Sequence, residues 1–459
     1  MEEIKPTVFR AYDVRGFYPN EINQNTAFVI GKALAVFLQK KYKKESLTIV
    51  VGRDGRNSSL ELSLAVKEGL LLAGVNIIDI GLVPAPVFYF SVWNNKFDGG
   101  VFITASHNPG QYNGFKLVGR DAVLIAANTG IVEVKDLAIK INAESQPTKT
   151  SSQKVEVIEK DYLADYERFV FKNFSLQNFK PLKIAVDCGN GAMGVFVSKI
   201  IKKIPGEHQL IFCDIDGNFP NHLPDPSQKS NLEKLSQKVI EAKCDLGVAF
   251  DGDGDRVGFV DERGEMISPN LITAFLVGYL AKKNKEKKFV YTVCMSNVIK
   301  DIVREVGGSL FMAKVGFTFV KELAKQQKAA IGAEISGHYC LKSDWFCEGP
   351  IFVWLSVLEE ISKTSKKTSD IFESFNRYFY EGPLNYEVKD KEKAISLLES
   401  HFKNGKVSKL DGVRVDFSDW WFNVRPSNTE NLLRVVIEAE TKQVLDEKKK
   451  EILEIFQGI

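Results

Sequence analysis

The chain has 459 residues, of which 44% are hydrophobic and 26% charged, and its formal net charge is +2. This length exceeds what one hydrophobic core usually organises, so it predicts two to four domains of an ordinary soluble, globular kind. A net charge this small excludes a global field for gripping nucleic acid, so any anionic ligand must be held by local charge.

The first ten residues carry acidic side chains and no apolar core, which indicates neither a secretory signal nor a transit peptide. The longest apolar stretches, 70–78 and 80–93, are interrupted by Asp79, Pro84 and Pro86, so no membrane-spanning helix is predicted. Six cysteines are scattered without a CxxC pair, which disfavours a zinc ribbon or a dense disulfide scaffold. We therefore expect reduced thiols and a cytoplasmic location.

Strands and helices alternate in the first third of the chain. Ser58 followed by Glu61 has the pattern of a capping box, which opens a helix ending near Gly74. The other predicted elements here are strands over 47–51, 75–80 and 100–104 and a helix after Pro86. This alternation predicts an α/β layer.

The same pattern restarts after a polar stretch over 142–154, which is a good linker candidate. A second polar stretch over 362–370 precedes a strand-rich region and a lysine-rich closing helix. Between these stretches the predicted strands cover 183–187, 245–250, 289–293 and 329–334.

Residues 251–256, Asp-Gly-Asp-Gly-Asp-Arg, alternate carboxylates with glycines directly after a predicted strand. Residues two apart in a straight strand are separated by roughly 6.6 Å, too far for compact chelation, but glycines let the chain curl. Three converging carboxylates repel one another unless a hard cation lies between them, and magnesium fits such a set. The alternative is a solvated acidic turn. A calcium-binding EF-hand loop is disfavoured because its sixth position holds Arg256 and strands flank it.

Ser106 lies where a predicted strand gives way to a turn, so its hydroxyl could be presented at a sheet edge; an ordinary turn residue is the alternative. The hydrolase elbow G-x-S-x-G is excluded because Thr104 and Asn108 occupy its glycine positions. We expect His107 to be a poor base for Ser106, because neighbours in an extended segment point to opposite faces.

Two further polar loops suit a sugar phosphate, although ordinary turns are the alternative for both. Residues 425–430 (RPSNTE) combine a guanidinium fork, which matches a phosphate, with hydroxyls and an amide. Glu334 and Ser336 stand two apart and could offer acceptors and a donor to adjacent sugar hydroxyls. His338 titrates near neutrality and could bind phosphate or shuttle a proton. Ligands bind at the carboxyl ends of strands in open α/β sheets, which favours chemistry at these loops.

Together and in this order, the four motifs resemble those of the α-D-phosphohexomutase superfamily, most closely its bacterial phosphomannomutase/phosphoglucomutase type. Segments 9–16 (FRAYDVRG), 52–56 (GRDGR), 112–116 (YNGFK) and 216–226 (DGNFPNHLPDP) are also similar to family segments. The resemblance implies an α/β fold with four domains around a central cleft: three mixed-sheet α/β domains and a small C-terminal α+β domain. With the polar stretches as linkers, we expect domains over 1–150, 151–262, 263–368 and 369–459.

The resemblance also implies a reaction and a role for each matching residue. The reaction is reversible transfer of a phosphoryl group between O1 and O6 of a mannose or glucose phosphate, through phosphorylated Ser106 and a hexose 1,6-bisphosphate. The implied catalytic residues are Ser106, Arg15, Lys116 and His338. The implied Mg²⁺ ligands are Ser106, Asp251, Asp253 and Asp255. The implied substrate-binding residues are Tyr12, His107, Glu334, Ser336, Arg425, Ser427, Asn428 and Thr429.

Three other functions stay open from the sequence. One is a mutase for another sugar, such as glucosamine phosphate or a pentose phosphate. A second is a non-catalytic sugar-phosphate sensor, because Cys294 stands where family members usually carry lysine or arginine. The third is a metal-dependent phosphatase, which releases free phosphate. As partners we expect small sugar phosphates, no nucleic acid and no membrane, and we expect a monomer or a weak homodimer.

Overall fold

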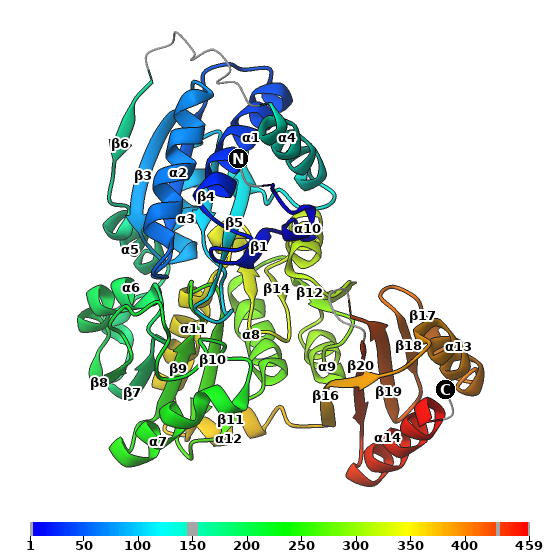
Figure 1. The fold of residues 1–459 in the computed structure, drawn as a ribbon. Helices are drawn as coiled ribbons and strands as arrows, with labels where there is room; N and C mark the ends of the chain where they lie inside the picture. The colour runs from blue at the N-terminus through cyan, green and yellow to red at the C-terminus, as the bar shows by residue number, and fades with distance from the viewer. Residues whose placement is uncertain (1–2, 145–154, 428–431, 458–459) are drawn as a thin grey trace. The chain divides into compact units, whose positions relative to one another are not determined.

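The computed structural model describes residues 3–144, 155–427 and 432–457, and it contains four β-sheets flanked by helices (Figure 1). The chain divides into two compact units. The first comprises Met1–Met266, Gly337–Tyr339 and Cys347–Thr368, and the second comprises Ile267–Ser336, Cys340–Phe346 and Ser369–Ile459. Among the described residues, none of the helices combines the length and apolar character that crossing a bilayer requires.

The first sheet has six strands in the order β1-β5-β4-β2-β3-β6. Strands β4, β2, β3 and β6 run parallel, whereas β5 is antiparallel to both β4 and β1, so the sheet is mixed. Its strands are β1 (Val14–Phe17), β2 (Thr48–Arg53), β3 (Asn76–Leu82), β4 (Gly99–Ile103), β5 (Tyr112–Gly119) and β6 (Val157–Glu159). Its helices are α1 (Gln24–Tyr42), α2 (Ser59–Leu72), α3 (Ala85–Asn94) and α4 (Ile131–Ala143).

Helices α1, α2 and α4 pack together over one core, which contains Leu34, Val66 and Val134 as fully buried side chains. The predicted strands and both predicted helices of this region are confirmed, but the capping box is wrong. Ser58 makes no capping hydrogen bond, because its hydroxyl accepts one from Asn113 Nδ2 at 2.8 Å. Glu61 instead accepts hydrogen bonds from the Tyr18 hydroxyl and from Gln24. Both side chains of the expected capping box therefore form hydrogen bonds with residues that are distant in sequence.

The second sheet has the order β11-β10-β9-β7-β8, with β7 parallel to β8 and β9, and β10 antiparallel to β9. Its strands are β7 (Leu182–Asp187), β8 (Gly206–Ile211), β9 (Leu246–Phe250), β10 (Val257–Asp261) and β11 (Met266–Ile267). The helices of this part of the chain are α5 (Leu163–Phe171), α6 (Met193–Ile200) and α7 (Glu233–Ala242), and α11 (Pro350–Ser362), from further along the chain, contacts β10. The two strands predicted here are confirmed.

Two cysteines correct the expectation of six reduced thiols. Cys188 directly follows β7 and Cys213 follows β8, and the two form a disulfide with Cα atoms 4.8 Å apart. Because β7 and β8 are parallel neighbours, their carboxyl ends meet although the cysteines are 25 residues apart in sequence. Cys244, Cys294, Cys340 and Cys347 are buried.

The third and fourth sheets belong to the second unit, apart from Tyr339 of β15. The third has the order β13-β12-β14-β15, and the fourth is antiparallel throughout, in the order β16-β20-β19-β18-β17. The strands of the third are β12 (Lys288–Thr292), β13 (Ser309–Ala313), β14 (Ile331–Ala333) and β15 (Tyr339–Leu341), with helices α8 (Pro269–Lys283), α9 (Asn297–Glu305) and α10 (Phe317–Gln327). The fourth contains β16 (Phe379–Glu387), β17 (Lys406–Ser408), β18 (Val413–Asp416), β19 (Trp420–Pro426) and β20 (Leu432–Ala439), with helices α13 (Lys391–His401) and α14 (Lys442–Gln457). Helix α12 (Thr368–Glu373) precedes this sheet in the chain, and its Phe372 ring lies 5.3 Å from that of Phe275 on α8. The predicted order of three mixed-sheet α/β domains followed by a small C-terminal α+β domain is confirmed.

Candidate active site

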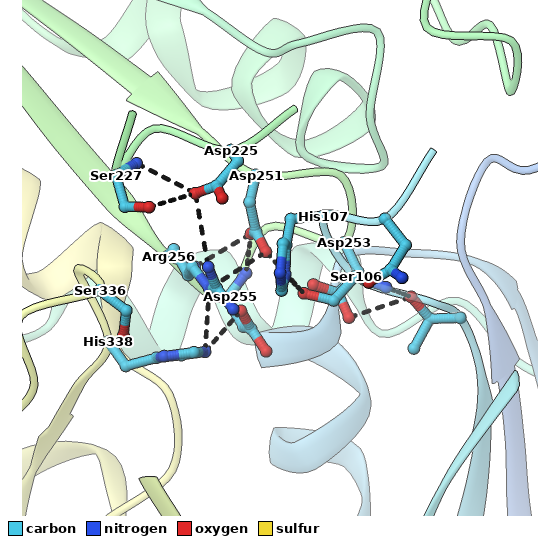
Figure 2. A network of polar contacts seen from close by, with 12 residues as sticks. Ser106, His107, Asp225, Ser227, Asp251, Asp253, Asp255, Arg256, Ser336 and His338 are labelled. Carbon is cyan, nitrogen blue, oxygen red and sulfur yellow. Dashed lines mark hydrogen bonds and ion pairs between the residues drawn. The ribbon is translucent and has the colours of Figure 1, made fainter. Parts of the chain in front are cut away.

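Ser106 lies in the loop between β4 and β5, in the first unit. Its backbone has a φ of 50°, a left-handed conformation that is uncommon for a residue other than glycine. Its backbone N–H donates to Thr104 Oγ1 at 2.8 Å, and its hydroxyl donates to Asp251 Oδ2 at 2.8 Å (Figure 2). The side chain that the sequence singled out therefore meets the acidic loop directly.

The expected separation of His107 from Ser106 is wrong. His107 Nδ1 lies 3.2 Å from Ser106 Oγ, because the left-handed turn at Ser106 brings the two side chains to the same side. Burial and the charges of Arg256 and Arg15 lower the pKa of His107 well below its ordinary value of 6.5. The ring is therefore neutral at physiological pH and can accept or donate a hydrogen bond at Ser106.

The three aspartates of the acidic loop converge after β9, as expected. Asp251, Asp253 and Asp255 are buried, and each offers a carboxylate oxygen within 4.8 Å of those of the others. The curl is held from inside, because Asp251 Oδ1 accepts hydrogen bonds from the backbone N–H groups of Asp255 and Arg256 at 2.9 and 3.0 Å. Gly252 is required by packing: a Cβ there would meet the Ser106 carbonyl oxygen at 2.5 Å.

Lys116, on β5, supplies the cation closest to this cluster. Its Nζ donates to Asp253 Oδ2 at 2.7 Å and to Asp255 Oδ2 at 2.5 Å. Burial alone would lower the pKa of Lys116, but these two carboxylates outweigh it and raise that pKa well above 10.5. Thr104 Oγ1 also donates to Asp253 Oδ2, at 3.1 Å, and so connects the serine loop to the acidic loop.

The cluster still has room for a metal ion. Oδ1 of Asp253 is buried and has no hydrogen-bond partner among the described residues, and Oδ1 of Asp255 is buried with the His338 ring nitrogen 3.1 Å away. Burial and the charges of Asp255 and Asp253 raise the pKa of Asp251 well above 3.8. Burial alone would raise the pKa of Asp255, but the charges of Lys116 and His338 outweigh it and hold that pKa well below 3.8. Unshared carboxylate oxygens that repel one another in a buried site fit a hard divalent cation.

Arg256 and His338 lie beside the acidic loop, where a backbone bridge joins their two segments. His338 Nε2 lies 3.1 Å from Asp255 Oδ1 and accepts a hydrogen bond from Arg256 Nε at 3.4 Å (Figure 2). Arg256 Nη1 donates to Asp225 Oδ1, also at 3.4 Å. The sequence did not single out Thr104, Arg256 or Asp225 as site residues, although Arg256 closes the acidic motif itself.

Arg15 approaches from β1. Its guanidinium donates to Asn108 Oδ1 at 2.7 Å and to Asp13 Oδ2 at 2.5 Å, which connects it to the loop that carries Ser106. Its Nε is buried and has no hydrogen-bond partner among the described residues. Tyr12 precedes Asp13 in the same segment and is half-buried. Arg15 therefore keeps one buried donor that the described residues leave unpaired.

The remaining predicted residues belong to the second unit. Glu334 follows β14, and its two carboxylate oxygens accept hydrogen bonds from the Gly316 backbone N–H at 2.9 Å and from the Ser336 hydroxyl at 2.8 Å. Glu334 and Ser336 thus share one hydrogen-bonded arrangement, as the spacing predicted. Arg425 lies near the end of β19, and the Ser427 backbone N–H donates to the Leu432 carbonyl at 2.8 Å. Asn428 and Thr429 lie outside the described residues.

Cys294 is buried in the second unit, 5% exposed, beside Trp421 and Val436. Burial raises the pKa of its thiol to about 11, and the charges of Glu334 and Arg425 both act on it. The thiol is therefore neutral at physiological pH and supplies no positive charge at this position. Arg425, in the same unit, is a cation whose charge acts on the Cys294 thiol.

Comparison with known proteins agrees with this fold. The chain matches the phosphoglucomutase/phosphomannomutase α/β/α domains I, II and III over residues 6–143, 160–264 and 268–378, and the C-terminal domain over residues 384–455. It is 33% identical to a phosphomannomutase of Methanocaldococcus jannaschii over 97% of this chain and 96% of the relative. It is 35% identical to a phosphomannomutase/phosphoglucomutase of Pseudomonas syringae pv. tomato over 96% of this chain and 93% of the relative.

A crystal structure of a phosphoglucomutase/phosphomannomutase family protein from Burkholderia thailandensis superposes with a TM-score of 0.89 and 28% identity, covering 99% of this chain and 98% of that one. Fold, domain order and acidic cluster thus define a protein with the architecture of a phosphoryl-transfer enzyme on sugars. The chain belongs to the phosphoglucomutase/phosphomannomutase family of enzymes.

Proposed function

We propose that this protein moves a phosphoryl group reversibly between O1 and O6 of a hexose phosphate, with mannose or glucose as the sugar, through phosphorylated Ser106. The observation that carries the proposal is the 2.8 Å contact between Ser106 Oγ and Asp251 Oδ2 in a cluster of three buried aspartates. A nucleophilic oxygen beside a cation-binding cluster and a charged lysine is the arrangement that phosphoryl transfer requires. The names of the relatives support this reaction class and these sugars.

The proposed cycle balances without release of phosphate. In the first half, the free O1 or O6 hydroxyl of the hexose monophosphate attacks the phosphorus of phosphoserine, the bond from phosphorus to Ser106 Oγ breaks, and a hexose 1,6-bisphosphate forms. The sugar hydroxyl loses a proton and Ser106 Oγ gains one. After the bisphosphate has turned round, Ser106 Oγ attacks the other phosphate, and the bond from that phosphorus to the sugar oxygen breaks. The sugar oxygen takes up the proton, so the products are the isomeric monophosphate and phosphoserine.

Residues of the first unit have distinct proposed roles in this cycle. Lys116 and Arg15 carry positive charges that stabilise the transferring phosphoryl group. His338 assists near the reacting group, supported by its position 3.1 Å from Asp255. His107 and Asp251 are the two acceptors within 3.2 Å of Ser106 Oγ. Tyr12 and His107 contribute to substrate binding.

We propose Mg²⁺ as the cation, held by Asp251, Asp253, Asp255 and the Ser106 oxygen. Three carboxylates leave positions for a phosphate oxygen in octahedral coordination, which suits magnesium better than calcium with its six to eight oxygen ligands. When bound, the ion neutralises charge that develops on the transferring group. Hexose 1,6-bisphosphate is the proposed intermediate, and traces of it recharge Ser106.

Substrate recognition is proposed for residues of the second unit. Glu334 and Ser336 bind adjacent sugar hydroxyls, and Arg425, Ser427, Asn428 and Thr429 hold the phosphate that does not react. The planar fork of Arg425 suits bidentate phosphate binding. For the rest of the protein, we keep as proposals the domain boundaries 1–150, 151–262, 263–368 and 369–459, a cytoplasmic location, and a monomer or weak homodimer.

The test is a coupled mutase assay with mannose 1-phosphate, glucose 1-phosphate and glucosamine 1-phosphate, with a trace of the matching 1,6-bisphosphate. Intact-mass measurement runs in parallel on the wild type and on Ser106→Ala. We expect turnover of the mannose or glucose substrate and one phosphate per chain that is absent from Ser106→Ala. Preference for glucosamine phosphate would change the substrate, free phosphate would favour a phosphatase, and binding without turnover would favour a sensor.

A further inference from the structure

Arg56 lies in the turn between β2 and α2, and its side chain is completely buried. Its two terminal nitrogens donate four hydrogen bonds to backbone carbonyls of the serine loop. Nη1 donates to Pro109 and Tyr112 at 2.8 and 3.0 Å, and Nη2 donates to Ser106 and Asn108 at 2.7 and 2.6 Å. One planar guanidinium therefore holds together a loop that no helix or strand organises.

The guanidinium itself is fixed from its other side. Arg56 Nε donates to Asp54 Oδ2 at 3.1 Å, while Asp54 Oδ1 accepts from the Arg56 backbone N–H at 3.0 Å and from the Ser59 hydroxyl at 2.6 Å. The ring of Phe219 lies 5.0 Å from the guanidinium carbon. The guanidinium is thus fixed by a buried carboxylate in the turn between β2 and α2, which preorganises it for its contacts with the serine loop.

All five N–H donors of the Arg56 side chain are used by these five acceptors, and an arginine has no others. Arg56 therefore has no donor left for a phosphate, and its burial excludes direct contact with substrate. Any effect of Arg56 on the reaction acts through the serine loop. This separates it from Lys116 and Arg15, which are proposed to act on the transferring group directly.

One of these hydrogen bonds from Arg56 reaches the residue of the serine loop whose backbone is strained. Ser106 has the left-handed φ of 50°, which costs a residue with a side chain roughly 1–2 kcal/mol. Its carbonyl oxygen is confined between Arg56 Nη2 and Gly252, where a Cβ would lie only 2.5 Å away. Displacement of this carbonyl would move Ser106 Oγ away from Asp251 Oδ2. Strain of this kind persists only where the surroundings determine the conformation.

We propose that Arg56 is a positioning residue for phosphoryl transfer. Its side chain, fixed by Asp54, donates four hydrogen bonds to the serine loop and so holds Ser106 in the conformation that points its hydroxyl oxygen toward the acidic cluster. This inference rests on the proposed function. It explains how one serine can serve both halves of a cycle in which the substrate turns round, because the protein side of the reaction stays fixed. A misplacement of about 1 Å in such a site can cost roughly 10²-fold in rate.

The test is Arg56→Lys, which keeps the positive charge but cannot reproduce a planar fork with five donors. We expect kcat to fall by roughly 10²-fold while KM for the hexose phosphate changes by less than about threefold, because the loss affects the reacting geometry rather than binding. The ³¹P resonance of phosphorylated Ser106 is expected to shift or broaden. Leu38→Ala, a buried change in the same domain core, is the control for general destabilisation and is expected to keep kcat within about twofold.

The proposal is overturned if Arg56→Lys keeps the kcat of Leu38→Ala and the narrow wild-type ³¹P resonance. Should Arg56→Lys fail to fold, Asp54→Asn replaces it, because this change weakens the carboxylate that holds Arg56 Nε and leaves the guanidinium in place. A roughly tenfold fall in kcat at unchanged KM is expected there, and an unaltered kcat overturns the proposal. Wild-type turnover is measured first. Absence of turnover in the wild type rejects the proposed function, whereas an active wild type with an equally active Arg56→Lys rejects the positioning role alone.

Discussion

Ser106 Oγ lies 2.8 Å from Asp251 Oδ2, although 145 residues separate the two in sequence. Each residue follows the carboxyl end of a buried strand, Ser106 after β4 and Asp251 after β9. A phosphate on Ser106 therefore stands beside a carboxylate, and the two anions repel each other unless cations intervene. Lys116 is one such cation, and the predictions below follow from this balance of charges.

The first prediction separates the chemical role of Ser106 from its backbone strain. Ser106→Ala and Ser106→Gly both remove the nucleophile, and both are expected to lose at least about 10³-fold in mutase activity. Because φ is 50° at this position, glycine is expected to be more stable there than alanine by about 1 kcal/mol. Chemical unfolding of the two variants checks this difference. Equal stability would mean that the left-handed turn is not maintained in solution.

The second prediction concerns Lys116 and magnesium. Lys116→Met leaves Asp253 and Asp255 buried without their shared cation, so the metal-free variant is expected to lose about 3–5 kcal/mol of stability. Mg²⁺ is expected to stabilise this variant more than the wild type, because the competing ammonium group has gone. Thermal unfolding with and without Mg²⁺ measures both effects. An equal gain in the two proteins would argue against a metal site at these aspartates.

The third prediction is a pH dependence away from the acidic cluster. His222 Nε2 lies 3.0 Å from Asp187 Oδ2, and Nδ1 lies 2.8 Å from the Leu223 carbonyl. Burial and the charge of Lys234 act in the opposite direction, but the hydrogen bond to Asp187 and its charge raise the pKa of His222 above 6.5. This stabilisation is fully present below pH 6.5 and is lost as pH rises through the folded-state pKa.

His222→Gln is therefore expected to lower the urea midpoint more at pH 5.5 than at pH 9. His208→Gln is the matched control, because burial lowers the pKa of that histidine and its contribution must show the opposite trend. A loss in His222→Gln that is the same at both pH values would show that the imidazole is not charged in the fold.

The fourth prediction concerns the second unit. The Arg414 side chain is 1% exposed; it donates to the Val293 carbonyl at 2.6 Å and lies 3.6 Å above the Trp421 ring. It thereby joins the end of β12 to the C-terminal sheet. Arg414→Met is expected to cost about 3–5 kcal/mol, because Asp416 loses its partner along with these contacts. Arg377→Met, at an exposed ion pair with Glu305, is expected to cost less than about 1 kcal/mol. Similar losses in both would contradict a dominant role for the buried arginine.

Sequence patterns were sufficient to predict the positions of the strands and of the polar loops that follow them. Apolar runs such as 245–250 fix a buried strand, and alternating glycines and aspartates fix a curl whose carboxylates converge. The failures share a cause, since each depends on a contact with a distant segment. The His107 ring lies beside the Ser106 hydroxyl because the loop is held in a left-handed turn. The Ser58 hydroxyl accepts a hydrogen bond from Asn113, 55 residues away, and does not cap its own helix.

Arg56 shows most clearly which contacts could not be predicted from the sequence. Within its own motif it reads as one of several charged residues after a strand, and no spacing rule indicates that its partners are carbonyl groups about 50 residues further along. Lys116 likewise has partners 137 and 139 residues away. The Cys188–Cys213 pair depends on the parallel neighbours β7 and β8, an order that the sequence alone did not provide. Residue types could be recognised, but their pairings required the fold.

The most direct measurement of the central claim is a single-turnover transfer experiment. Protein carrying ³²P on Ser106 is mixed with unlabelled mannose 6-phosphate or glucose 6-phosphate in the presence of Mg²⁺, and the label is followed on the protein, in sugar phosphates and as free phosphate. The account predicts that the label leaves the protein and appears first in the hexose 1,6-bisphosphate, with Ser106 as its only protein site. Label that stays on the protein, or that appears directly as inorganic phosphate, would contradict it.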